Sequence, residues 1–126
     1  MRYVLDTTLL IDHSKGRPGV AELVESLFAE SSDLYTCDVV VAEALTGGDE
    51  VQRAMIESLI RAVEYVATPP DAAVWAADSR RRRGAFGPRS LADAIIAGVA
   101  WFNDATVVTR NPRHFEAQGV RVLGYE

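Results

Sequence analysis

The chain has 126 residues, of which 48% are hydrophobic and 25% are charged, and its net charge is −5 at pH 7. This length is that of one domain, since a single core usually takes roughly 100–200 residues, and the composition excludes disordered, collagen-like and disulfide-rich proteins. The lone cysteine, Cys37, excludes an internal disulfide and a multi-cysteine zinc site. We therefore expect one soluble cytoplasmic domain, residues 1–126, without a membrane span, because no apolar run reaches about 18–20 residues.

Charge is distributed unevenly along the chain. Residues 1–79 hold 5 Lys and Arg against 14 Asp and Glu, whereas residues 80–126 hold 8 against 4. Such an asymmetry is typical of an acidic site beside a basic docking surface.

Short apolar runs alternate with amphipathic stretches in the first half of the chain. We expect a strand at 3–5, a short helix from Asp6 through His13, a helix from 20 to about 30, a strand at 34–36, a helix from 38 to Gly47, and a helix from 49 to about 63. The assignments depend on apolar residues that recur at helical spacing and on capping residues before them.

The same alternation continues in the second half. We expect a strand at 65–67, a helix from the prolines at 69–70 to the arginine block, a helix from 90 to about 102, a strand at 106–109, a helix start at 111–112 and a strand at 120–123. This order predicts an α/β fold in which helices cover both faces of a small parallel sheet. Ligands of such sheets bind beyond the carboxyl ends of the strands.

Four polar residues from distant segments are candidates for one site. Asp6 ends the first strand and Asn111 follows the strand at 106–109, so both project toward the same edge of a parallel sheet. Glu43 and Asp93 lie within apolar runs, where an unpaired buried carboxylate would be costly. Neighbouring carboxylates repel each other unless a cation intervenes, and their hard oxygen ligands suit Mg²⁺ or Mn²⁺ rather than zinc.

Purely structural roles compete with this interpretation. Asp6 and Asn111 stand where helix caps occur, and Ser90 and Asp93 have the spacing of a capping box. No capping position explains Glu43.

Other residues are expected to be structural. Asp12 is interpreted as a cap or a solvated acid. Trp75, Trp101, Met55 and Phe102 lie on apolar helical stripes, so we expect them to pack in the core.

The ordered series of these features resembles the PIN-domain ribonucleases, and among them the VapC toxins of bacterial toxin–antitoxin pairs. The resemblance covers nearly the whole chain and is carried by Val4-Leu5-Asp6-Thr7-Thr8 with Leu10-Ile11-Asp12, by Glu43, by Leu91-Ala92-Asp93-Ala94-Ile95-Ile96-Ala97, and by Val107-Val108-Thr109-Arg110-Asn111 with His114-Phe115. It implies a PIN-like three-layer α/β/α fold with a small, mostly parallel sheet of about five strands.

The resemblance also implies a set of site residues. Asp6, Glu43 and Asp93 would form an acidic site for Mg²⁺, which Mn²⁺ could replace, with Asp6 and Asp93 as direct ligands and Glu43 acting partly through water. Asn111 takes a fourth position that is often aspartate in the family, which leaves open whether a second metal binds. Two hydroxyl residues would orient the carboxylates, namely Thr7 and Thr109.

The implied activity is metal-dependent endoribonuclease action on tRNA or ribosomal RNA, which would inhibit translation and growth. The implied partners are a VapB-like antitoxin and a second copy of the chain in a homodimer. The arginines that could contact RNA phosphates are Arg80, Arg81, Arg82, Arg83, Arg89 and Arg110. A solvated helix end, where cations complement the helix dipole, is the competing interpretation of the block at 80–83.

Three other functions are alternatives to this one. A haloacid-dehalogenase-type phosphatase needs an aspartate where Thr8 stands, and a receiver domain needs a lysine after a late strand, whereas the only lysine is Lys15. A catalytically weak PIN-like module that binds RNA or a partner remains open, and Asn111 is the feature that favours it.

Overall fold

The computed structural model describes residues 1–30 and 33–126. Its sheet contains the strands β1 (Arg2–Leu5), β2 (Asp33–Cys37), β3 (Glu64–Val66), β4 (Thr106–Thr109) and β5 (Val122–Gly124). They lie in the order β3-β2-β1-β4-β5, and every neighbouring pair is parallel. The expected small parallel sheet is therefore confirmed.

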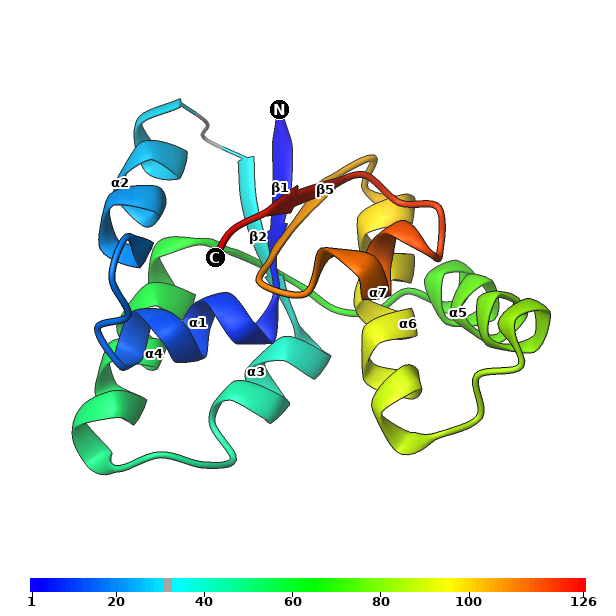
Figure 1. Ribbon diagram of the computed structural model, residues 1–126, viewed down its shortest axis with the longest axis horizontal. Helices are drawn as coiled ribbons and strands as arrows, with labels where there is room; N and C mark the ends of the chain where they lie inside the picture. Colours follow the sequence, from blue (N-terminus) through cyan, green and yellow to red (C-terminus); the bar gives the residue numbers. More distant parts are fainter. Residues whose placement is uncertain (31–32) are drawn as a thin grey trace.

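Helices cover both faces of this sheet, as Figure 1 shows. On one side lie α1 (Thr7–Ser14), α2 (Val20–Glu30), α3 (Asp38–Ala44) and α4 (Glu50–Ala62), and on the other lie α5 (Pro70–Arg83), α6 (Pro88–Phe102) and α7 (Pro112–Glu116). The helices fall on opposite faces because parallel crossovers are right-handed. The chain crosses the sheet in one direction from β1 to β3 and in the opposite direction from β3 to β4 and β5. The three-layer α/β/α architecture expected from the sequence is confirmed.

The strand order creates a crevice between β1 and β4. These strands are neighbours, but the connection after β1 runs toward β2 and the connection after β4 runs toward β5. The two crossovers leave in opposite directions, so the carboxyl ends of β1 and β4 flank a topological switch point. Asp6 and the segment after Thr109 stand at this point.

Local sequence signals explain several helix ends and one close helix contact. Asp49 caps α4 through a capping box, in which its side chain accepts from the Gln52 amide at 2.8 Å. Gly84 ends α5 in the left-handed conformation, with φ of 61°. On α6, a Cβ at Gly98 would lie 2.5 Å from the carbonyl oxygen of Ala72, so α5 and α6 approach each other more closely than any other residue would allow.

The expectation that four large side chains pack in the core is largely wrong. Trp101 and Phe102 are each 49% exposed and Met55 is 38% exposed, while Trp75 is half-buried and stacks on Trp101 with ring centroids 5.9 Å apart. Trp101 and Phe102 form the last turn of α6, whose buried face ends at Ala100. An apolar stripe predicts a face of a helix but not how far the sheet beneath it extends.

The expectation that Asp12 is a helix cap or a solvated acid is wrong. Its side chain is buried on α1, with 4% exposure, instead of capping a helix or facing solvent.

Among the helices of the described residues, none is long and apolar enough to cross a membrane.

Candidate active site

Asp6 is the most buried acid at the carboxyl edge of the sheet. Its backbone amide donates to the carbonyl of Val108 at 3.0 Å, which holds the end of β1 against β4. One carboxylate oxygen accepts from the hydroxyls of Thr109 at 2.7 Å and Thr8 at 3.0 Å. Asp6 takes the N-cap position of α1, but its side chain makes no capping hydrogen bond to the helix.

Burial makes the Asp6 carboxylate a costly charge. Burial raises the pKa of Asp6, and the hydroxyl bonds from Thr109 and Thr8 oppose that rise. No basic side chain of the described residues forms an ion pair with it. A bound cation would lower this cost, because it would supply the positive charge that no side chain of the described residues provides.

Asp93 faces the same cleft from the second turn of α6. Its carboxylate lies 3.1 Å from Nδ1 of His114, which belongs to α7. Burial raises the pKa of Asp93, the negative charges of Asp6 and Glu43 raise it further, and His114 lowers it. The charges of Asp6, at the end of β1, and of Glu43, on α3, therefore act on Asp93.

The capping-box interpretation of Asp93 does not hold. The helix begins at Pro88 and has Gly87 at its cap, so Ser90 lies inside the first turn. The Ser90 hydroxyl donates to the carbonyl oxygens of Ala85 and Gly87, both at 2.7 Å. The side chain of Asp93 is left available for the cleft.

Glu43 and Thr7 form the third part of the site. The Thr7 hydroxyl donates to the Glu43 carboxylate at 2.7 Å, which joins the first turn of α1 to α3. The sequence context suggested a buried acid, whereas Glu43 is exposed. The buried face of α3 consists of Val40 and Ala44, so the apolar residues around Glu43 do not cover it.

Asn111 lies beside these acids after β4. Its backbone amide donates to the Thr109 hydroxyl at 3.0 Å, and that hydroxyl in turn donates to Asp6. Its side chain makes no capping bond to α7, although it precedes Pro112 as a cap would. The amide side chain is therefore free to act in the cleft.

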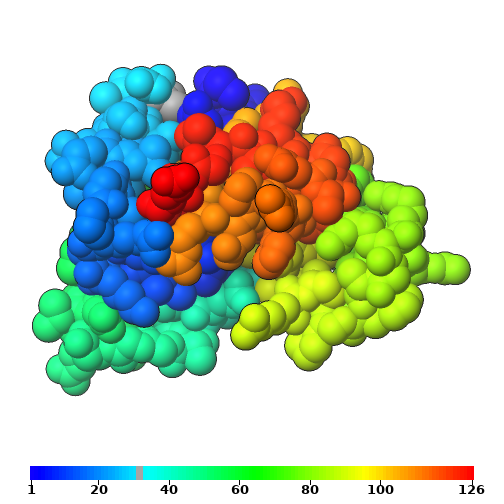
Figure 2. All heavy atoms as spheres, viewed as in Figure 1, coloured from blue at the N-terminus to red at the C-terminus, as the bar shows by residue number. Residues whose placement is uncertain are grey.

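The four candidate residues line one open cleft of about 240 Å³. The surface in Figure 2 is indented between α3 and the first turn of α6, where this cleft opens. Its lining residues are Asp6, Thr7, Thr8, Glu43, Arg89, Asp93, Asn111 and His114.

The donors fit a hydrated magnesium ion better than a closed metal site. Within residues 1–30 and 33–126, no three acidic, imidazole or thiol side chains lie close enough together to bind a metal ion on their own. Mg²⁺ retains several waters and usually binds through one or two carboxylates together with substrate phosphates. Asp6 and Asp93, which line the same cleft, match that requirement.

The candidate phosphate-binding arginines divide into two groups. Arg89 lines the cleft, and Arg81, Arg82 and Arg83 are exposed at the end of α5. By contrast, the Arg80 guanidinium donates to the carbonyl of Ala85 at 3.1 Å and to the Ser90 hydroxyl at 3.3 Å. Arg80 therefore braces the loop between α5 and α6.

Arg110 belongs to a network that sequence reasoning missed. Its guanidinium pairs with the buried Asp12 at 3.1 Å, and the Tyr125 hydroxyl donates to the other Asp12 oxygen at 2.7 Å. Burial and the bond to Asp12 raise the pKa of Tyr125. The backbone amide of Arg110 also donates to the Thr8 hydroxyl at 3.2 Å. Together these contacts hold the C-terminal segment and the loop after β4 against α1.

Two further residues of the cleft received no specific role from the sequence. Thr8 stands beside Thr7 in the Asp-Thr-Thr segment, so its contact with Asp6 could have been suspected from the spacing. His114 lies in a segment that resembles the family, but its contact with Asp93 spans 21 residues and leaves no local signal.

An apolar groove adjoins the cleft. It has a volume of about 190 Å³ and lies between α1, α3 and α4, with Ile11, Lys15, Ala44 and Ile56 among its lining residues. Glu43 lines both the groove and the cleft.

Known proteins share both the sequence pattern and the fold. Residues 3–120 match the PIN domain family. A ribonuclease named VapC19 from Mycobacterium tuberculosis is 31% identical over 113 residues, which cover 89% of this chain and 90% of that protein. Among solved structures, DNA-bound VapBC from Salmonella typhimurium has a TM-score of 0.77 at 26% identity over 98% of both chains. VapBC2 of Rickettsia felis, bound to a promoter DNA fragment, has a TM-score of 0.81 at 16% identity over 100% of both chains.

These matches extend over almost the entire chain, and the solved structures share its fold. The chain therefore belongs to the PIN domain family, and within it to the VapC group.

Proposed function

We propose that the protein is a Mg²⁺-dependent endoribonuclease and the toxin of a VapBC-type toxin–antitoxin pair. The observation that carries this proposal is the buried Asp6 carboxylate, which shares a cleft with Asp93 and has no basic partner among the described residues. A ribonuclease among the relatives supports the choice of RNA as substrate.

The residues of the cleft would have different roles in catalysis. Asp6 and Asp93 would hold the ion, and Glu43 would act through water. When bound, Mg²⁺ supplies positive charge that stabilises the charge developing on the phosphodiester oxygens. The hydroxyls of Thr109 and Thr8 fix the orientation of the Asp6 carboxylate, which is the function of residues behind metal ligands.

Substrate contacts would come from the basic side of the cleft. Arg89 lies in the cleft lining, where its guanidinium can pair with a phosphate in bidentate fashion. Exposed Arg81, Arg82 and Arg83 extend this positive surface beyond the cleft. The substrate is a structured RNA, either tRNA or ribosomal RNA, and its cleavage inhibits translation.

A VapB-like antitoxin would neutralise the toxin at the same cleft. Structures of VapBC complexes share the fold of this chain. A basic side chain of the antitoxin would enter between Asp6, Glu43 and Asp93, and an apolar segment would fill the groove that begins at Glu43. We further propose a homodimer that acts in the cytoplasm.

The decisive experiment measures cleavage of tRNA and ribosomal RNA with Mg²⁺, with Mn²⁺ and with a chelator, and maps the new 5′ ends. Asp93→Asn is expected to lower the rate by about 100-fold or more, because losing a metal ligand removes several kcal/mol of transition-state stabilisation. Asp78→Asn, the same substitution at an exposed acid on α5, is the matched control and should cleave normally. Cleavage in chelator, or equal rates for both variants, would refute the metal-site assignment.

Growth tests the role as a toxin. Expression of the wild-type chain alone should arrest growth, and Asp93→Asn should relieve the arrest. Folded wild-type protein that binds RNA without cleaving it and leaves growth unchanged would instead indicate the catalytically weak binding module.

A further inference from the structure

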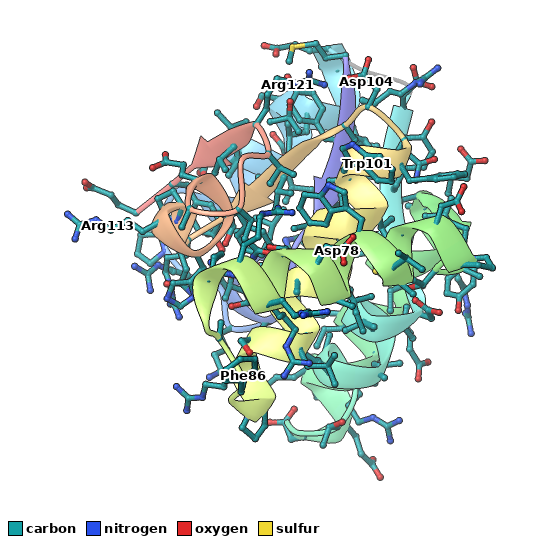
Figure 3. The ribbon with its side chains drawn as sticks, turned by 90° about the vertical axis from the view of Figure 1, so that its right-hand side faces the viewer. Asp78, Phe86, Trp101, Asp104, Arg113 and Arg121 are labelled. Atoms are coloured by element: carbon teal, nitrogen blue, oxygen red, sulfur yellow. The ribbon has the colours of Figure 1, made fainter. Side chains whose placement is uncertain are left out.

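The loop between α5 and α6 presents an aromatic side chain to solvent. Phe86 is 73% exposed at this loop, and Figure 3 shows it at the end of the molecule opposite Asp104 and Arg121. An exposed phenylalanine keeps a large apolar surface in water, which is unfavourable unless a ligand covers it.

The loop holds Phe86 in a defined position. The carbonyl of Ala85 accepts from Ser90 and Arg80, and the carbonyl of Gly87 accepts from the Ser90 hydroxyl at 2.7 Å. The Ala85 amide also donates back to the Arg80 carbonyl at 2.9 Å. Both residues beside Phe86 are therefore anchored, so the backbone at Phe86 would lose little conformational freedom on binding a ligand.

The surroundings of Phe86 are strongly basic. Arg81, Arg82, Arg83 and Arg89 are exposed around the loop, and none of them takes part in an ion pair within the described residues. No acidic residue occurs between positions 79 and 92. Arg89 also lines the catalytic cleft, and Asp93 follows it by one helical turn.

We propose that Phe86 is a stacking platform for an unpaired base of the RNA substrate, beside the cleft in which the phosphodiester bond is cut. This inference rests on the proposed ribonuclease function and names the single-stranded character of its substrate. Unpaired bases stack on aromatic rings while arginines bind the flanking phosphates, and this surface offers both groups next to the acids. A base in a helical stem is already stacked and would not reach the ring.

The charge of the loop favours RNA over a second copy of the chain. A second copy of the chain that docked through the same loop would bring two sets of unpaired arginines together, and like charges at an interface are unfavourable. An RNA with exposed bases can bind the arginines through its phosphates and the ring through a base.

The test measures RNA affinity in the Asp93→Asn background with Mg²⁺, so that no substrate is consumed. The probes are a single-stranded RNA oligonucleotide and the duplex of the same length, each titrated at two salt concentrations. Phe86→Ala should weaken binding of the single strand by about 5- to 150-fold, and Phe86→Trp should restore it. Phe102→Ala, which removes an exposed phenylalanine from the far end of α6, is the matched control and should bind like its parent.

The salt dependence separates stacking from charge. Phe86→Ala should leave the slope of affinity against salt unchanged, because the ring contributes no counterion release, whereas Arg81→Gln should reduce that slope. In the catalytically intact chain, Phe86→Ala should still cleave RNA at saturating substrate with a raised KM.

Several results would overturn the proposal. Equal affinity of Phe86→Ala and its parent for the single strand would refute it, while cleavage by the wild type would leave the proposed function standing. An equal loss on the duplex would also refute it. A loss of affinity that coincides with a change in mass by light scattering would assign Phe86 to an interface between copies. A parent protein that neither binds nor cleaves RNA would refute both proposals.

Discussion

Thr109→Val tests whether the hydroxyls around Asp6 support its charge. Thr109 is fully buried in β4, and its hydroxyl donates to the Asp6 carboxylate at 2.7 Å. Valine has nearly the same shape, so the substitution leaves the packing in place but removes both the donor to Asp6 and the acceptor for the Asn111 amide. The Thr8 hydroxyl then remains as the donor to that carboxylate oxygen.

The expected loss follows from three contributions. The hydrogen bond to the charged Asp6 acceptor contributes about 1.5–3 kcal/mol to the free energy of unfolding, and the bond from the Asn111 amide contributes about 0.5–1.5 kcal/mol. The additional buried methyl group offsets about 0.8 kcal/mol of this loss. We therefore expect Thr109→Val to lower the free energy of unfolding by about 1–4 kcal/mol at neutral pH.

The loss should depend on pH. The Thr109 hydroxyl lowers the pKa of Asp6 against the effect of burial, so its removal raises that pKa further. A raised pKa in the folded state means that the deficit is complete above this pKa and shrinks as the pH falls through it. Urea unfolding of the metal-free protein at several pH values measures both the size and the direction of the effect.

Thr106→Val is the matched control on the same strand. Its hydroxyl is buried and has no hydrogen-bond partner in the part of the chain that the structure describes. Replacing it should cause no loss and could add up to about 1 kcal/mol, since an unsatisfied buried group is removed. Equal losses for the two variants, or a loss at Thr109 that is independent of pH, would refute the reasoning.

Two further predictions concern the charges around α1. Because burial raises the pKa of Asp6, the metal-free protein should lose stability as the pH rises from about 4 through that pKa. Asp6→Asn should flatten this dependence and abolish stabilisation by added Mg²⁺, and identical urea profiles for variant and wild type would contradict the assignment. Tyr125→Phe should lower the free energy of unfolding by about 1–2 kcal/mol, since the buried Asp12 loses a donor at 2.7 Å, and unfolding by urea at pH 7 would detect it. An unchanged midpoint would show that the C-terminal contact contributes nothing.

The sequence by itself determined the elements and the edge at which the acids meet. Apolar spacing and capping residues predicted strands and helices close to their observed bounds, because these signals act within a few residues of the chain. Strand–helix alternation required a parallel sheet, and a parallel sheet places Asp6 and the segment after Thr109 at the same edge. The helical position of Asp93 followed from the same local patterns.

Only the tertiary structure decided which partners these residues have. Asp12 is buried because Tyr125 and Arg110, distant in sequence, fold back onto α1, and no local pattern encodes that contact. Arg80 braces its own loop while the arginines after it remain exposed, although the four are identical neighbours in sequence. Periodicity specifies the face of an element, whereas burial, ion pairing and pKa depend on segments that the sheet topology brings together.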